Sequence, residues 1–344
     1  MAAYTSIDDP SAYFKVQLYT GTGSGGSDRQ ITFDDTDTDM QPDLVWIKNR
    51  DSAQEHVLVD SVRGATKDLD PSENTAESTT STRVGSFLSD GFQLGSGSLQ
   101  NRVNGSSHKM VAWCWKETAD AGFDIVSFTG NATARTISHS LSAVPKLMIV
   151  KNRADSAGWI VYHGANTSAP ATDGLTLDTS DATDDDAGYW NDTVTTDTKI
   201  TLANGDPIGG SGYDHIMFAF CNVPGFSHMG SYYGTNRASG QFVYTGFKPA
   251  YIMIKAATNV EGWNIFDNLS NPVNVANKNL MANTNAALAT NGTGAADKKI
   301  DILSKGFRID STSTELSPDG GNVIYAAFAE HPLVSNNGKA ATAR

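Results

Sequence analysis

Short apolar runs, bounded by polar turn residues, recur three times along this chain. Each run leads from a proline through apolar residues to a lysine six positions later. The runs are Pro42–Lys48, Pro145–Lys151 and Pro249–Lys255, and their prolines are 103 and 104 residues apart. Because repetition at a fixed period determines architecture before any local pattern does, we predict three related units of about 105 residues.

Other patterns keep the same register. Each unit has an aromatic-Thr-Gly triplet, a second apolar run that starts fourteen residues after the proline, and an apolar closing run. The second run ends on Asp60, His163 or Asp267, so we interpret His163 as a polar group at a strand end rather than as a general base. The other repeated positions are Tyr19, Phe128 and Tyr244 (triplet), His56, Trp159 and Trp263 (second run), and Trp115, Phe220 and Phe328 (closing run).

The runs predict β-structure. They are five to seven residues long, rich in Val, Ile, Trp, Phe and Tyr, and bounded by Gly, Asn, Asp and Ser, which is typical of strands and turns. The closing run is apolar on both faces, as in a central strand. We therefore predict an all-β chain of three tandem antiparallel β-sandwich-like repeats, with Trp115, Phe220 and Phe328 each buried in its own unit.

The predicted organisation has five parts. They are an N-terminal arm (1–11), three sandwich repeats (12–117, 123–225 and 240–333) and a C-terminal tail (334–344). A unit of this size can bury a core of its own. The rival architecture is one continuous structure, such as a propeller or a pseudo-threefold assembly.

Composition excludes some classes of function. The net charge of −13 and pI near 4.8 argue against direct contact with nucleic-acid phosphates, which needs clustered Lys and Arg. No apolar stretch approaches the ~20 residues that span a membrane, and residues 1–10 lack the pattern of a signal peptide. Cys114 and Cys221 lie on closing runs of different units, and we expect both to be buried apolar side chains rather than a disulfide.

Few motifs suggest chemistry. Gly21–Gly26 matches G-x-G-x-x-G, but the next residues predict a strand rather than a phosphate-binding helix, so we interpret it as a hairpin loop. Two acidic loops are either solvated or weak calcium sites. No zinc pattern occurs, and we expect no metal, no organic cofactor and no catalytic residue. The acidic loops consist of Asp34, Asp35, Asp37 and Asp39, and of Asp181, Asp184, Asp185 and Asp186.

Tyr189 and Trp190 follow the second acidic loop and have no counterpart in the other units. Aromatic side chains beside polar groups can stack on a sugar ring, so these two are candidate glycan contacts. The alternative is that they fold back over their own sandwich.

Five segments carry a resemblance to known proteins: Pro42–Arg50, His56–Gly64, Ser89–Phe92, Val111–Lys116 and Ala327–Pro332. They resemble a widespread protein family of marine tailed bacteriophages, including cyanophages. The resemblance is strongest in the first unit and the last strand. It implies a virion structural protein of the tail-fibre, tail-accessory or head-decoration type, and it implies no catalytic residues.

These observations favour a non-catalytic virion structural protein, on the tail, that aids attachment to the host. A capsid decoration protein or head fibre is the alternative in the same class. A carbohydrate-binding module or a glycan-degrading enzyme is the alternative in a different class. Expected partners are other virion proteins, further copies of the chain and a host surface glycan, but neither nucleic acid nor membrane. The chain would fold in the host cytoplasm before assembly.

Overall fold

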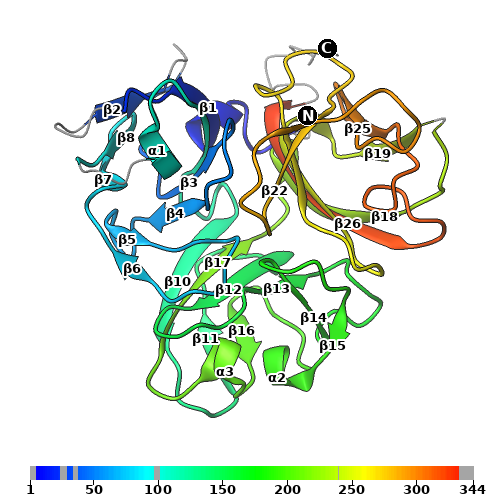
Figure 1. Cartoon of the computed structure of the whole chain (residues 1–344). Coiled ribbons are helices and arrows are strands. Elements are labelled where there is room, and N and C mark those ends of the chain that lie inside the picture. The colour runs from blue at the N-terminus through cyan, green and yellow to red at the C-terminus, as the bar shows by residue number, and fades with distance from the viewer. Residues whose placement is uncertain (1–4, 24–28, 34–37, 97–100, 239, 333–344) are drawn as a thin grey trace.

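Three lobes of β-structure surround a common centre in the computed structural model (Figure 1). The structure describes residues 5–23, 29–33, 38–96, 101–238 and 240–332. Every named strand pair is antiparallel, so the predicted all-β fold is confirmed.

Each lobe contains one large sheet. The first sheet runs β1 (Phe14–Thr20), β9 (Lys109–Trp115), β3 (Leu44–Asn49) and β4 (Val57–Asp60). The second runs β10 (Phe123–Thr129), β17 (Asp214–Phe220), β12 (Leu147–Asn152), β13 (Ile160–His163), β14 (Asp173–Thr176) and β15 (Asp184–Asp185). The third runs β18 (Ser227–Tyr233), β26 (Asn322–Pro332), β20 (Phe247–Ala256), β21 (Asn264–Asp267), β22 (Lys278–Met281) and β23 (Ala289–Thr290).

A smaller sheet accompanies each large one. These sheets are β2 (Arg29–Thr32), β8 (Gly91–Leu94) and β7 (Val84–Leu88), then β11 (Arg135–Ser138) and β16 (Lys199–Leu202), then β19 (Gln241–Tyr244), β25 (Gly306–Ile309) and β24 (Ile300–Leu303). β5 (Lys67–Asp68) pairs with β6 (Ser78–Thr79). The short helices are η1 (Pro10–Ala12), α1 (Asn101–Asn104), α2 (Ala187–Trp190) and α3 (Asp206–Gly209).

The order of strands recurs. In each large sheet the closing strand (β9, β17 or β26) lies between the first strand of the lobe and the strand that carries the Pro-to-Lys run. This is the central position that its two apolar faces predict. The detailed superposition of the three lobes remains a prediction.

The predicted equivalence of the third aromatic-Thr-Gly triplet to the other two is wrong. Tyr19 and Phe128 lie on the first strands β1 and β10, but Tyr244 lies on β19 in a small sheet. The strand equivalent to β1 and β10 is β18, which pairs with β26 and ends in Tyr233, just before Gly234. A boundary at residue 240 therefore excludes the first strand of the third lobe.

Backbone packing explains the glycines at these strand ends. A Cβ built on Gly21, Gly130 or Gly234 would lie 2.0 Å from a backbone carbonyl oxygen of a neighbouring loop. Any side chain would force the two segments apart. At the end of β18 the equivalent triplet is Tyr232-Tyr233-Gly234, so the three lobes share the glycine but not the threonine.

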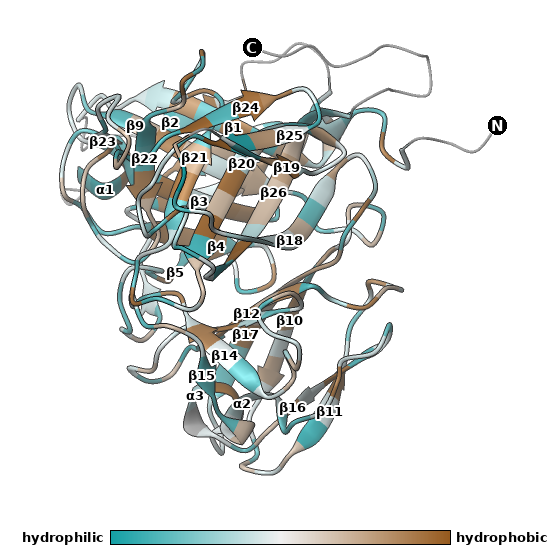
Figure 2. Ribbon diagram, turned by 90° about the vertical axis from the view of Figure 1, so that its right-hand side faces the viewer, coloured by the Kyte–Doolittle hydropathy of each residue, from teal (hydrophilic) through white to brown (hydrophobic). Residues whose placement is uncertain are grey.

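The large sheets bury both faces. On β3, Val45 and Ile47 face the core of the first sandwich, while Leu44 and Trp46 join a core that all three lobes share. The closing aromatics meet there, since ring centroids lie 5.5 Å apart for Trp115–Phe328 and for Phe220–Phe328. They are buried as predicted, but in a shared core rather than each in its own unit. Figure 2 shows hydrophobic residues, in brown, along β20 and on neighbouring strands of the large sheets.

The described part of the N-terminal arm packs on its own chain. The Thr5 hydroxyl donates a hydrogen bond of 3.0 Å to the carbonyl of Pro224, and Ile7 is buried in the shared core. Residues 1–4 and the predicted tail 334–344 lie outside the described residues. In the described part of the chain, no helix is long and apolar enough to cross a membrane.

The shared core predicts how the chain unfolds. Trp115→Ala is expected to lower the free energy of unfolding by about 3–5 kcal/mol, because a packed aromatic ring is lost. We expect one transition for the whole chain in guanidinium chloride, followed by circular dichroism and tryptophan fluorescence. Tyr233→Ala, at a site that is 68% exposed, is the control and should change stability by under about 0.5 kcal/mol. Three separate transitions would contradict a common core.

Candidate functional site

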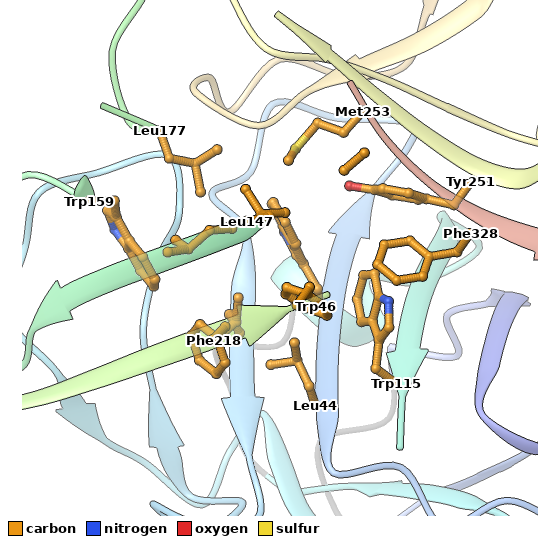
Figure 3. A pocket seen from close by; sticks show the side chains of 14 residues that line it. Leu44, Trp46, Trp115, Leu147, Trp159, Leu177, Phe218, Tyr251, Met253 and Phe328 are labelled. Atoms are coloured by element: carbon orange, nitrogen blue, oxygen red, sulfur yellow. The ribbon is translucent and has the colours of Figure 1, made fainter. Parts of the chain in front are cut away.

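The centre of the molecule holds a small apolar cavity. Side chains from all three lobes line it, among them Trp46, Leu147 and Met253 (Figure 3). Its volume is about 30 Å³, far below the ~300–1,000 Å³ of typical ligand pockets. The cavity is a gap between large aromatic and aliphatic side chains, and it does not suit an organic cofactor.

The three repeated lysines are fully buried beside this core. Lys48 donates hydrogen bonds to the carbonyls of Asn49 (2.9 Å) and, in the third lobe, Asn285 (3.1 Å). Lys151 does the same with Asn152 (2.9 Å) and, in the first lobe, Asn74 (3.1 Å). Two of the lysines therefore join neighbouring lobes.

Lys255 binds carbonyls of its own lobe, those of Ala256 (2.7 Å) and Asn259 (3.0 Å). Burial lowers the pKa of all three lysines to about 8, partly opposed by nearby carboxylates. An amine with such a pKa can act as a nucleophile. Here the ammonium groups are enclosed and bonded to backbone carbonyls, so the arrangement favours a structural role.

Hydrogen bonds from the residues that begin the second run also cross between lobes. His56 donates to the carbonyl of Thr284 in the third lobe (3.0 Å). The indole N–H of Trp159 donates to the backbone carbonyl of Asp70 in the first lobe (3.0 Å), and that of Trp263 donates to the backbone carbonyl of Thr176 in the second (2.9 Å). Each lobe thus offers a backbone carbonyl to a side chain of the next lobe, and the three contacts close a ring.

Two buried histidines that bond to a neighbouring lobe, His56 and His163, are held neutral. His56 accepts the indole N–H of Trp46 (2.8 Å) while it donates to Thr284. His163 donates to the carbonyl of Tyr325 (3.1 Å) and accepts the N–H of Ala165 (3.2 Å). Burial lowers the pKa of His56 to about 3 and that of His163 to about 4. With both ring nitrogens engaged, His163 fits the predicted role at a strand end.

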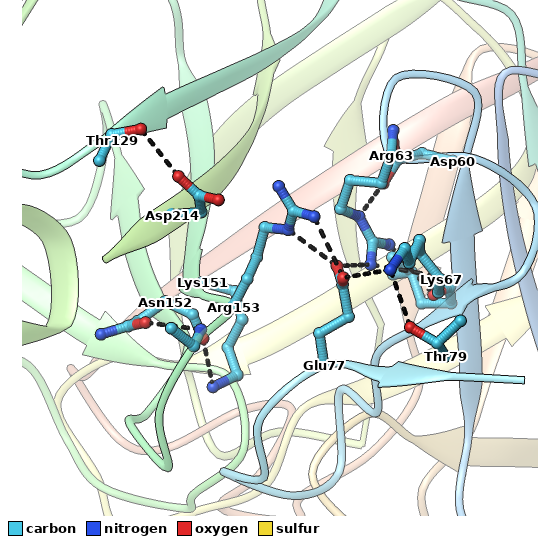
Figure 4. Close-up of polar contacts among 12 residues, drawn as sticks. Asp60, Arg63, Lys67, Glu77, Thr79, Thr129, Lys151, Asn152, Arg153 and Asp214 are labelled. Carbon is cyan, nitrogen blue, oxygen red and sulfur yellow. Dashed lines mark hydrogen bonds and ion pairs between the residues drawn. The ribbon is translucent and has the colours of Figure 1, made fainter. Parts of the chain in front are cut away.

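An ion network joins the first and second lobes (Figure 4). The guanidinium of Arg153 donates two hydrogen bonds to the carboxylate of Glu77, at 2.8 and 3.1 Å. The buried Arg63 donates to the same carboxylate at 3.0 Å and to Asp60 at 2.5 Å. Burial raises the pKa of Glu77, but the bonds from Arg153 and Arg63 outweigh it and hold the pKa below its usual value.

The predicted glycan contact does not hold for Trp190. Its side chain is fully buried in the core of the second sandwich, and its indole N–H donates to the carbonyl of Asp173 (3.0 Å). A ring without exposed surface offers no face to a sugar. Tyr189 is half-buried at the edge of the same core, so for Tyr189 the contact remains a prediction.

The acidic loops are only partly described. Asp34, Asp35 and Asp37 lie outside the described residues, as do residues 24–26 of the glycine-rich loop. In the second loop Asp184 and Asp185 form β15, and Asp186 caps α2 by accepting the N–H of Gly188 (2.7 Å). Among the described residues, no three His, Cys, Asp or Glu side chains are placed to hold a metal ion. Cys114 and Cys221 are free and buried, as predicted.

A family model matches residues 9–332, which span the three lobes. Its description is a domain of unknown function, DUF7483. The chain belongs to the DUF7483 family. No curated protein matches the chain.

In this DUF7483 domain, sequence reasoning located the lysines but missed their role. The signal was present, because a lysine that ends an apolar run three times over indicates a buried cation. The partners of these lysines are backbone carbonyls, which carry no side-chain signature. The Glu77 network left no repeated signal either, since only the first lobe supplies Glu77 and Arg63.

The buried lysines predict a pH dependence. The pKa of Lys151 is about 8 in the folded chain, against 10.5 as the ordinary value of a lysine, so the unfolded chain binds more protons between these values. Its contribution to stability is complete above pH 10.5 and is lost as the pH falls to 8. In urea unfolding, the stability of the parent chain relative to Lys151→Met should rise from pH 8 to pH 10, by up to about 1.4 kcal/mol per unit.

The exposed Lys199 supplies the matched control. The stability of Lys199→Met should follow that of the parent chain at every pH, because the side chain of Lys199 is exposed on β16. If Lys151→Met also runs parallel to the parent chain, the lysine is not held at a lowered pKa.

The Glu77 network predicts that a single nearly isosteric substitution strongly lowers the stability of the fold. Glu77→Gln removes the charge that balances Arg63 and Arg153, and the side chain of Arg63 is fully buried. We expect a loss of about 3–5 kcal/mol in the free energy of unfolding, since Arg63 and Arg153 are then balanced only by the carboxylate of Asp60. Glu55→Gln breaks a more exposed pair with Arg102 and should cost under about 1 kcal/mol. Equal costs for the two variants would argue against the network.

Proposed function

We propose that the chain is a non-catalytic structural protein of a bacteriophage particle, placed on the tail, where it aids attachment to the host. The observation that carries this proposal is that the buried charged and polar side chains serve contacts within the chain. Buried lysines, neutral histidines and the Glu77 network all join parts of the chain to one another. A protein that uses these groups to hold its own lobes together is suited to a mechanical or display role.

The loops support a role in recognition. The glycine at the end of the first strand and the proline of the next repeated strand are separated by 21 residues in the first lobe, but by 15 in the second and third. Among the described residues, α2 occurs in the second lobe alone, whereas α3 before its closing strand corresponds to α1 of the first lobe. Variable loops on a constant frame suit the recognition of a changing surface. The resemblance to tailed-bacteriophage proteins agrees with this role.

The proposed partners follow from the same class. They are other virion proteins, further copies of the chain and a host surface glycan, with Tyr189 as the candidate contact. A capsid decoration protein or head fibre would use the same rigid frame, and we keep it as the second proposal.

Deletion of the gene from the phage that carries it tests the function. We expect intact particles that adsorb poorly to the host, and gold-labelled antibody against the chain should mark the tail of the parent phage. Fragile heads with label on the capsid would support decoration instead. Normal particles with normal adsorption, together with turnover of a glycan by the purified chain, would replace the structural proposal with an enzyme.

A further inference from the structure

The first strand of each lobe lies at the edge of its large sheet, and two of these edges are capped. In an antiparallel ladder every second residue points its N–H away from the partner strand. On β10 this outward N–H belongs to Ile125 and donates to the carboxylate of Glu117 (3.0 Å). On β18 it belongs to Met229 and donates to the side-chain oxygen of Asn222 (2.7 Å).

Both capping residues come from linkers. Glu117 and Asn222 stand two residues after the closing aromatics Trp115 and Phe220, where the chain passes from one lobe to the next. The covalent connection between lobes thus covers the edge that it leads into.

The third junction, between the last lobe and the first, has no such connection. Val16 on β1 corresponds to Ile125 and Met229 in register, and within the described residues its N–H has no hydrogen-bond partner. Glu330 stands two residues after Phe328 and forms an ion pair with Lys248 at 3.3 Å. The edge of β1 is therefore not capped as the other two edges are.

A groove of about 380 Å³ lies along this edge. Residues 11 and 14–18 form one wall, and Leu269 with residues 329–331 belong to the other. The end of β26 thus borders the groove, and the chain continues beyond Pro332 for twelve more residues.

The side chains at this edge also differ from those of the other two. Where β10 and β18 carry the exposed Ser127 and Ser231, β1 carries the partly buried Leu18. On β1 the carbonyl of Leu18 accepts a hydrogen bond from the side-chain amide of Gln17 (2.8 Å), but among the described residues the N–H of Val16 stays open. An edge strand with an open N–H and an apolar side chain is a template for a further strand, and proteins normally cover it. Of the three equivalent positions, only the one on β1 carries an apolar side chain.

We propose that this groove binds the C-terminal segment of the chain, residues 333–344, along the outer edge of β1. The groove is walled by the third lobe, so it admits a single extended segment rather than the edge of another sheet. The segment starts at the rim of the groove, which gives it a high effective concentration there. It takes the position that the linkers occupy at the other two junctions. The inference depends on the fold and not on the proposed virion role.

Peptide binding tests this proposal. A chain that ends at Pro332 is titrated with a labelled synthetic peptide of residues 333–344, and binding is followed by fluorescence anisotropy. We expect saturable binding, and binding to the full-length chain at least about ten-fold weaker because its own segment competes. Leu18→Ser in the shortened chain should weaken binding by about ten-fold or more through lost apolar contact. Val16→Pro should abolish it by removing the donor N–H.

Ser127→Pro on β10 is the matched control, since it alters the edge position equivalent to Leu18 at an edge that does not line this groove. It should leave binding unchanged. Circular dichroism and melting temperature identify variants that do not fold, and Leu18→Ser keeps the test readable if Val16→Pro does not. Equal binding of a scrambled peptide, equal binding to both chain lengths, or undiminished binding by Leu18→Ser would overturn the proposal.

Discussion

The structure depends on burial of both faces of the closing strands. Trp115, Phe220 and Phe328 cannot all be covered by the small sheets, because each sandwich already uses the opposite face of the strand for its own core. The second apolar face has to meet another large sheet, and three such faces cover one another around a common centre. The lobes are therefore not independent domains on a string, and each lobe lacks half of its core without the other two.

An apolar centre alone would leave the three lobes free to slide or rotate against one another. Directional contacts at its border prevent this. Five side chains each donate to a backbone carbonyl of a neighbouring lobe: Lys48, Lys151, His56, Trp159 and Trp263. Four of these carbonyls lie in loops that follow short strands, and the fifth belongs to Thr176, the last residue of β14. Burying an ammonium group is costly, and here the carbonyls offset part of that cost. The apolar core supplies most of the free energy, and the buried donors fix the arrangement.

The sequence predicts the strands better than it predicts their association. Repeated runs such as Pro42–Lys48 reveal strand identity, because periodicity reports which faces are apolar. They do not report whether an apolar face meets a small sheet or another lobe, and so the shared core was only an open alternative. The alignment at Tyr244 failed because an aromatic-Thr-Gly triplet is a local signal, whereas the feature that recurs is a glycine pressed against a distant carbonyl. The predicted glycan contact at Trp190 was wrong because a side chain with polar neighbours in the sequence can still be buried.

A closed ring made from an open chain has one junction unlike the rest. Two junctions are covalent, and there the linker residues Glu117 and Asn222 cap the next edge strand. At the third junction the last lobe meets the first, and the ring is closed by packing and hydrogen bonds alone. The recurring arrangement of strands is therefore broken beside β1, where the proposed binding of residues 333–344 would cover the edge. A segment bound there would leave the hydrogen bonds between lobes intact, because these come from Lys48 on β3, from Lys151 on β12 and from the second runs.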